Sequence, residues 1–391
     1  MALLLSFTTA VGQEVRGEDT VGKEVCGGDS ARAASQLRVS LLLSEPGDQY
    51  FYSIFGHAAL RFQTPDMDAD YTFTYVGEQL DDGAFARYMR GALKMGLAVS
   101  PTEDYIAHEQ ARRMYEYPLA LPDSLARALL TICGREVQAG FKKQYDPITG
   151  SCSHKIALYL NEAAGVVGQN IVYSDWGEDY ELSVRELCAR YTEAFPWAQW
   201  LYATLPGSRV DTRQISRMAH LMYPAQLLRL WRGATIEGMP LLNGERTLMV
   251  EGEPMGEQTP VTPLMVAIVL LVLAVLSLGR WMGQRWMQWL NVPLLVVIGV
   301  VGSVLWYMWL LTDLPYTDWN WLIVPMNPLI IAFWRWRRYW GIPYALVLCA
   351  LLIYTVVSPY AVMLPAWQVV TAAVMIAVGN GTPKGLWKME N

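Results

Sequence analysis

Charged residues are scarce in this 391-residue chain: they make up 17% of it, where a soluble domain has about 25%. Hydrophobic residues make up 53%, the mean hydropathy is +0.19, and there are 16 Trp and 18 Met. This shortage of charge argues against a wholly soluble enzyme and against a disordered chain. Five cysteines in the whole chain also exclude a small disulfide scaffold.

Recognisable metal-binding patterns are missing as well. The cysteines form no CxxC, and the four histidines form no HxH or HExxH: His57, His108, His154 and His220. Zinc sites usually take their ligands from such closely spaced residues. The sequence therefore predicts a protein without a metal.

Charge divides the chain into two parts. From residue 260 onward there are seven Lys or Arg and three Asp or Glu, whereas residues 1–259 hold 23 basic and 33 acidic residues. The acidic part is not expected to bind nucleic acid, because phosphate contacts need clustered Lys and Arg. The pattern predicts an acidic, water-soluble half followed by an apolar membrane half.

Apolar stretches of about 16–21 residues predict five membrane spans in the second half. They are residues 262–279, 291–311, 319–334, 341–358 and 362–379. The third is the shortest and contains Pro325, Asn327 and Pro328, so we expect it to be broken, kinked or partly re-entrant. Asn320 and Asn327 are costly in lipid, which makes them candidates for substrate or lipid contact, and the alternative is a role in helix packing.

Basic residues predict the orientation of these spans. They follow only the odd-numbered spans: Arg280, Arg285, Arg335, Arg337, Arg338, Lys384 and Lys388. The loops around 312–318 and 358–361 contain none. Because positively charged loops stay in the cytoplasm, the C-terminus should be cytoplasmic and residues 1–259 should lie outside.

The residue pattern of the soluble half predicts an α+β domain in which a small antiparallel sheet packs against helices. Its predicted strands are 36–43, 57–63 and 70–76, and its predicted helices are 80–95, 101–113, 122–140, 151–161, 183–194 and 214–232. The predicted domain order is a signal remnant and flexible leader (1–34), a soluble domain (35–245), a linker (246–261) and the membrane domain (262–391).

Two residues have the chemistry of a catalytic pair. Cys152 follows a Pro–Gly turn and begins a predicted helix, where the helix dipole and Lys155 favour a thiolate. His57 begins a predicted strand directly after Gly56, which leaves room for a neighbouring group. His154 is a rival base, but two residues from Cys152 on a helix it should point to another face. The alternative is that the cysteine is buried packing and the histidine structural.

Several segments together resemble one known family. LLLSEPGDQYFYSIFGHAALRF, DYTFTYVG, ARYMRGALKMGL and YDPITGSCSHKIALYL resemble the periplasmic domain of the Bacteroidetes lipoprotein N-acyltransferases called Lnb. TDLPYTDWNWLIVPMNPL resembles the membrane part of that family. The likeness covers most of residues 36–391, and the GH-x-ALR element with the later cysteine is its most specific feature.

The resemblance implies a circularly permuted NlpC/P60 (papain-like) fold, in which the histidine precedes the cysteine. It implies that Cys152 is the nucleophile and His57 the base, oriented by Thr74 or Tyr75 on the neighbouring strand. The family often has Asn where Thr74 stands here. It also has Asn before the cysteine, where this chain has Ser151. The predicted substrate-binding residues are Ser53, Gly56, Ser151, Asn320 and Asn327.

The function implied by the resemblance is acyl transfer in the bacterial inner membrane, with the catalytic domain in the periplasm. The partners are a phospholipid acyl donor and a diacylated lipoprotein, whose N-terminal amine receives the acyl group through an acyl-Cys152 intermediate. This chemistry needs no metal, nucleotide or CoA. Two alternatives remain: a membrane-tethered cell-wall amidase or peptidase of the NlpC/P60 type, and a non-enzymatic envelope module.

Overall fold

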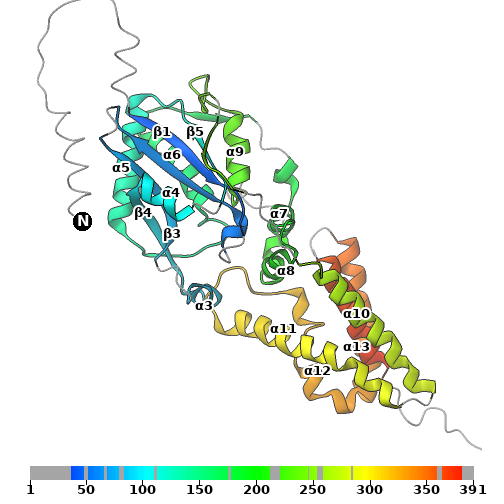
Figure 1. Ribbon diagram of the computed structural model, residues 1–391. Coiled ribbons are helices and arrows are strands. Elements are labelled where there is room, and N and C mark those ends of the chain that lie inside the picture. Colours follow the sequence, from blue (N-terminus) through cyan, green and yellow to red (C-terminus); the bar gives the residue numbers. More distant parts are fainter. Residues whose placement is uncertain are drawn as a thin grey trace, which may run out of the picture. The chain divides into compact units, whose positions relative to one another are not determined.

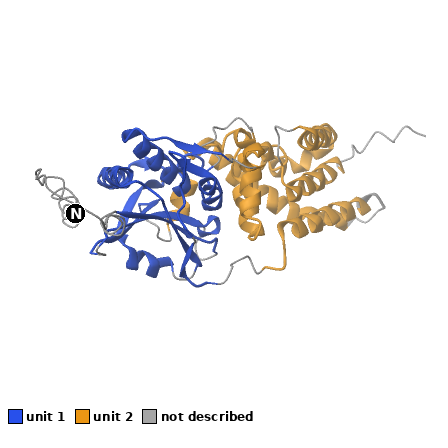
Figure 2. Ribbon diagram, turned by 90° about the horizontal axis from the view of Figure 1, so that it is seen from above, with its two compact units in different colours: residues 1–81, 93–177, 216–255 blue, residues 82–92, 178–215, 256–391 orange. Residues whose placement is uncertain are grey.

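The computed structural model divides the chain into two compact units (Figure 2). Unit 1 comprises residues 1–81, 93–177 and 216–255, and unit 2 comprises residues 82–92, 178–215 and 256–391. The structure describes residues 37–47, 52–65, 68–78, 83–109, 112–174, 178–211, 221–244, 246–252, 259–282, 285–358 and 363–380. The predicted leader, Cys26 and His220 lie outside these ranges.

Unit 1 is built on a seven-stranded antiparallel sheet in the order β10-β5-β1-β2-β3-β4-β6 (Figure 1). The strands are β1 (Arg38–Ser44), β2 (His57–Gln63), β3 (Asp70–Gly77), β4 (Lys94–Pro101), β5 (Met114–Pro118), β6 (Lys143–Gln144) and β10 (Thr247–Val250). The predicted strands correspond to β1, β2 and β3. This unit and the helical second unit confirm the predicted α+β domain followed by an all-α domain.

Side chains of the central strands alternate between two covered faces of the sheet. On one face, Thr72 of β3 shares a 2.9 Å hydrogen bond with Thr102 of α4 (Thr102–Glu109). On the other, the Lys155 ammonium of α6 (Cys152–Val166) lies 5.9 Å from the centre of the Tyr75 ring. Helix α5 (Asp123–Ala139) packs beside α6 and against β4. Residues 74 and 75 therefore face opposite sides of the sheet.

Two predicted helices are shorter in the structure, and β4 takes the end of the first and the first residue of the second. The predicted helix 80–95 is reduced to α3 (Ala84–Met89), and the predicted helix 101–113 ends at Glu109. Of these two ranges only residues 94–95 and 101 belong to β4, which pairs with β3, whereas β5 begins at Met114 and pairs with β1. Short apolar patterns fit helix and strand alike, and here the available sheet edge decides. In the same way, β10 occupies part of the predicted linker 246–261 and pairs with β5.

A second, three-stranded sheet completes unit 1. It has the order β7-β8-β9, formed by Ile171–Tyr173, Ala234–Ile236 and Met239–Pro240. The helix α9 (Pro224–Arg232) packs against α6, so this region supports the helix that begins at Cys152.

Unit 2 contains the apolar helices. They are α10 (Pro263–Leu276), α11 (Val292–Leu311), α12 (Leu329–Ala332), α13 (Arg337–Val357) and α14 (Pro365–Gly379). Among the residues that the structure describes, two helical stretches are long and apolar enough to cross a membrane, 286–311 and 334–357, whereas 263–279 and 365–379 are shorter. The third predicted span is broken as expected, into the short helices η8 (Trp321–Ile323) and α12.

A segment that precedes the first apolar helix also belongs to unit 2. It holds α7 (Val184–Tyr191), α8 (Pro196–Thr204) and η4 (Ser208–Asp211). The amide of Gly207 donates to the Tyr316 carbonyl at 2.6 Å, and Arg209 pairs with Asp318 at 3.0 Å. A Cβ on Gly207 would stand 1.6 Å from the Asp318 carbonyl oxygen, so only glycine permits this approach. The contact fixes residues 204–209 to the loop between α11 and η8.

Candidate active site

A tight turn places His57 at the start of β2. The short helix η2 (Ser53–Phe55) ends at Gly56, whose φ of 72° lies in the region that favours glycine. A Cβ on Gly56 would stand 2.8 Å from the Ser44 carbonyl oxygen. The glycine therefore lets the chain turn directly into the strand and brings the imidazole to the end of the sheet.

Cys152 is the first residue of α6. The preceding turn is closed by Asp146, whose carbonyl accepts a hydrogen bond from Gly150 and whose carboxylate accepts from the amides of Ile148 and Thr149. Ser151 caps the helix by accepting a 3.1 Å hydrogen bond from the His154 amide. Cys152 thus meets the positive end of the helix dipole, as the sequence predicts.

The Cys152 and His57 side chains lie within hydrogen-bonding reach of one another. Burial raises the pKa of the Cys152 thiol, but the charge of His57 and a hydrogen bond from it act in the other direction. Further hydrogen bonds come from the Ala58 amide and the Ser153 hydroxyl, and together these groups hold the pKa of Cys152 below its usual value. The site therefore stabilises the thiolate form of Cys152 relative to an ordinary cysteine.

The pKa of His57 is shifted in the complementary direction. Burial lowers its pKa, but the Cys152 thiolate, through its charge and a hydrogen bond, and then the charge of Glu109 outweigh this effect and leave the pKa raised. The second ring position is held by Thr74, because His57 Nε2 lies 2.6 Å from Thr74 Oγ1. This contact leaves Nδ1 to face Cys152. Strand pairing produces the geometry: Thr74 lies opposite Ala59, on the same face of the sheet as His57.

The structure separates Tyr75 from this group. Tyr75 lies on the opposite face of β3, where burial raises the pKa of its phenol to about 12. Of the two residues that the sequence suggests for orienting His57, the structure brings only Thr74 to the imidazole. His154 is also turned away: its Nδ1 lies 3.3 Å from the Ile148 carbonyl, and burial lowers its pKa.

Two of the predicted substrate-binding residues in unit 1 hold the local backbone. The buried Ser53 hydroxyl donates a 3.0 Å hydrogen bond to the Gly47 carbonyl. The Ser151 hydroxyl, besides capping α6, donates to the Leu221 carbonyl at 3.3 Å. Both side chains shape the turns that carry His57 and Cys152.

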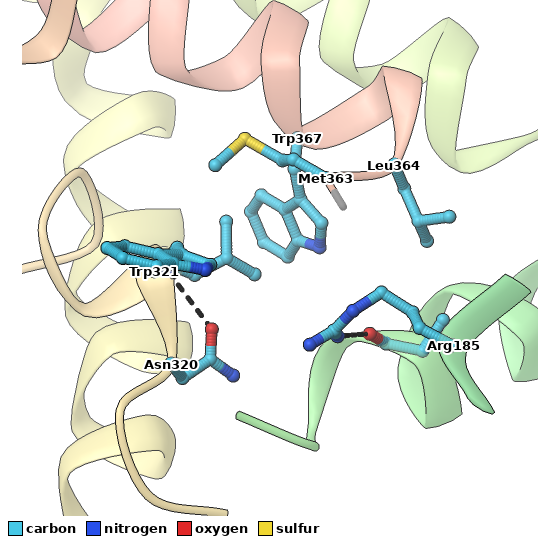
Figure 3. A pocket seen from close by; sticks show the side chains of 8 residues that line it. Arg185, Asn320, Trp321, Met363, Leu364 and Trp367 are labelled. Atoms are coloured by element: carbon cyan, nitrogen blue, oxygen red, sulfur yellow. Dashed lines mark hydrogen bonds between the residues drawn. The ribbon is translucent and has the colours of Figure 1, made fainter. Parts of the chain in front are cut away.

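The two predicted asparagines lie in unit 2, where their side chains form hydrogen bonds with the backbone at and around the broken third span. Asn320 donates to the Thr204 and Pro206 carbonyls at 2.7 and 3.1 Å and accepts from the Leu322 amide at 3.0 Å. Asn327 accepts a 3.0 Å hydrogen bond from the Leu329 amide. Figure 3 shows Asn320 and Trp321 at a small pocket opposite Arg185, with Met363, Leu364 and Trp367 forming its apolar wall.

One pair near His57 has no counterpart in the sequence predictions. Glu109, the last residue of α4, forms an ion pair with Arg112, and both side chains are buried. The sequence indicates this pair only by two opposite charges three residues apart. Such pairs are common on exposed helices, so the spacing does not indicate a buried ion pair. The burial that gives this pair its influence on His57 comes from the tertiary fold.

Comparisons with known proteins agree with this architecture in both halves of the chain. The family model described as the Lnb N-terminal periplasmic domain matches residues 29–179. The model described as the Lnb transmembrane domain matches residues 255–379. Searches of curated proteins and of solved structures found no significant match.

Proposed function

Because this chain belongs to the Lnb family of lipoprotein N-acyltransferases, we propose that Cys152 carries an acyl group from a membrane phospholipid to a lipoprotein, with His57 moving the protons. The family makes the protein an acyltransferase of the inner membrane that acts on lipoproteins, with a periplasmic domain and a transmembrane domain. The finer mechanism is supported by one observation: a thiol at a helix N-terminus lies beside a half-buried imidazole that a threonine contacts.

The first half-reaction forms a thioester. The Cys152 thiolate attacks the carbonyl carbon of a phospholipid ester, and the oxygen becomes negatively charged. Backbone N–H groups in the first turn of α6 point toward this charge, as in other helix-terminal anion sites. When the C–O bond breaks, the His57 imidazolium gives its proton to the departing lysophospholipid oxygen. The lysophospholipid therefore leaves as a neutral alcohol, and the acyl group stays on Cys152 as a thioester.

The second half-reaction transfers the acyl group to nitrogen. The N-terminal amine of a diacylated lipoprotein attacks the thioester carbon, and neutral His57 accepts a proton from that amine. The C–S bond then breaks, which restores the thiolate and the imidazolium. Thr74 supports both steps because its hydroxyl, at 2.6 Å from Nε2, keeps Nδ1 directed toward the sulfur.

An acyl-enzyme is the observation that tests this mechanism. Full-length protein in vesicles of phospholipid with a labelled acyl chain should gain the mass of one acyl group, located at Cys152 by peptide mass spectrometry. Addition of a diacylated lipopeptide should remove the label from the protein and place it on the lipopeptide amine. Cleavage of cell-wall peptides without any acyl adduct would instead support the amidase alternative.

We further propose five crossings with a cytoplasmic C-terminus. Within unit 2, the segment before α10 contacts three places that should lie on one side of the membrane. The Trp197 indole donates to the Val261 carbonyl at 2.7 Å, the Gly207 amide donates to Tyr316, and Trp200 stacks on Trp367 with ring centres 4.7 Å apart.

These contacts constrain the number of crossings. Suppose that the start of α10, the loop before η8 and the start of α14 all lie on the periplasmic side. The chain must then cross the membrane an even number of times between the first and the second of these places, and again between the second and the third. Helix α14 then carries the chain inward. At the opposite end, Asn380 donates to the Ser277 carbonyl at 3.2 Å, which puts the ends of α10 and α14 together. The placement of the basic residues agrees with this orientation.

Reporter fusions check the proposed topology. Green fluorescent protein after Asn391 should fluoresce, and alkaline phosphatase at the same position should be inactive, because each reporter works on only one side of the membrane. The same reporters inserted after Thr317 should give the reverse pattern. Active phosphatase at the C-terminus would contradict the five-crossing arrangement.

A further inference from the structure

We propose that Glu109 and Arg112 are a positioning pair for His57: together they hold the turn before the imidazole and keep a negative charge close to it. This inference rests on the acyl-transfer mechanism proposed above, because it concerns the protonated state of His57 which that mechanism uses. It assigns a role to two residues that do not need to touch the substrate.

The geometry ties the end of α4 to the turn that carries His57. Glu109 and Arg112 are 7% and 4% exposed and contact one another through their charged groups. Arg112 Nη1 also donates to the Ser53 carbonyl at 3.5 Å, and this carbonyl accepts the amide of Gly56 at 3.0 Å. The peptide group before His57 is therefore linked to a buried ion pair through one shared oxygen atom.

A second link joins the same helix end to β1. The Glu45 amide donates to the Arg113 carbonyl at 2.8 Å, and Ser44 lies opposite His57 in the β1–β2 pairing. The end of β1, the turn before β2 and the segment after α4 thus converge beside the imidazole. A buried ion pair at this junction is costly unless both charges stay paired, so it fixes one arrangement of the three segments.

Three charged groups and burial determine the pKa of His57. Cys152 and Glu109 favour the imidazolium, Arg112 opposes it, and burial opposes it as well. Tyr105 belongs to a buried hydrophobic cluster that also contains Ala59. It stays neutral because burial raises its pKa well above the usual value. Besides the thiolate, Glu109 is thus the anion that stabilises the protonated form of His57, which must donate its proton in the proposed mechanism.

If the pair acts on His57 through its charges, each substitution should shift the pH at which His57 loses its proton in a defined direction. A purely structural role of the pair would not predict these directions. Glu109→Gln removes the anion but leaves the Arg112 cation, so His57 should lose its proton at a lower pH. Removing both charges with Glu109→Gln/Arg112→Gln also removes the opposing cation, so the midpoint should move back toward the wild-type value. We expect the single variant to lower the midpoint by roughly 1 pH unit, the size of effect that one nearby charge produces.

The measurement follows Cys152 rather than acyl transfer. Full-length protein is alkylated with anionic iodoacetate and with neutral iodoacetamide across a range of pH, and peptide mass spectrometry quantifies the product at Cys152 alone. The imidazolium attracts the anionic reagent, so the ratio of the two rates falls as His57 loses its proton. The midpoint of that fall reports the proton on His57 in each variant.

Glu116→Gln is the matched control, because Glu116 is a partly buried carboxylate of the same unit that pairs with Arg61. Its midpoint should equal that of the wild type. An unchanged midpoint in Glu109→Gln, or a double variant shifted as far as the single one, would overturn the inference. Should Glu109→Gln fail to fold, the double variant, which buries no unpaired charge, must still lie below the wild type.

These outcomes are separable from failure of the proposed function. If Cys152 forms no acyl-enzyme, the mechanism is wrong whatever the alkylation midpoints are. If the acyl-enzyme forms but the midpoints do not move as described, the mechanism stands and the role of the Glu109–Arg112 pair is disproved.

Discussion

Replacing Cys152 by Ser should reduce lipoprotein N-acylation by at least about 1,000-fold, the scale seen when a covalent nucleophile is removed. A serine hydroxyl stays protonated at neutral pH, so neither the helix dipole nor the His57 charge can produce the anion that attacks the ester. Mass spectrometry of lipoprotein N-termini, in cells that lack the protein and re-express each variant, measures the effect directly.

The control for this substitution is Cys349→Ser. Cys349 is an exposed residue of α13 and belongs to the other compact unit. The variant should restore N-acylation to the wild-type level. Lipoproteins that remain fully N-acylated with Cys152→Ser would show that the thiol does not carry the acyl group.

Replacing His57 by Ala should make Cys152 much less reactive near neutral pH. Burial is the largest influence on the thiol and raises its pKa, and His57 is the main group that reverses this effect. Without the imidazolium, the pKa of Cys152 should rise above that of an ordinary cysteine. The rate of alkylation by iodoacetamide at pH 7 should then fall by roughly 100-fold, because only the thiolate reacts.

The pH dependence distinguishes the two proteins further. In the wild type, the pKa of Cys152 is lowered and that of His57 is raised, so the ion pair exists between the two values. It is lost at low pH when the thiolate gains a proton, and at high pH when the imidazolium loses one. In His57→Ala, alkylation should have a single rise at alkaline pH.

His108→Ala is the control, because His108 is exposed at the end of α4. It should keep the wild-type alkylation profile. Thr74→Val should give a smaller loss than His57→Ala, since the imidazole remains but its Nε2 loses the hydroxyl contact. Equal rates for wild type and His57→Ala would remove the ion pair from the mechanism.

The local chemistry of the site could be predicted from single segments. A glycine before His57, and a turn followed by a helix that begins at Cys152, are features of short stretches of sequence, and the structure keeps both. The contact between the two residues could not be predicted from either segment alone. It depends on the packing of α6 against β2, which joins residues 95 positions apart in the chain.

The choice between Thr74 and Tyr75 shows why a neighbouring strand is harder to predict. The two residues differ by one position, and one position along a strand reverses the face of the sheet. The register of β3 against β2, with Thr74 opposite Ala59, directs the threonine to His57 and the tyrosine to Lys155. Sequence patterns alone leave that register open.

The two compact units show a similar limit at the level of domains. Hydropathy locates the apolar helices, because about 20 apolar residues are needed to cross the hydrocarbon of a bilayer. It does not reveal that residues 178–215, which are polar enough for the soluble half, share a unit with those helices. Their attachment depends on individual contacts, such as that of Gly207 with Tyr316 and the stacking of Trp200 on Trp367, which leave no periodic pattern.

Composition and local pattern alone determined that this protein has an acidic soluble half, an apolar helical half and a thiol at the start of a helix. These properties follow from hydrophobicity, charge and helix capping, which act over a few residues. Tertiary structure decided which histidine meets that thiol, which hydroxyl holds the imidazole and which buried charges surround them. Strand register and burial join distant parts of the chain, and no short segment contains that information.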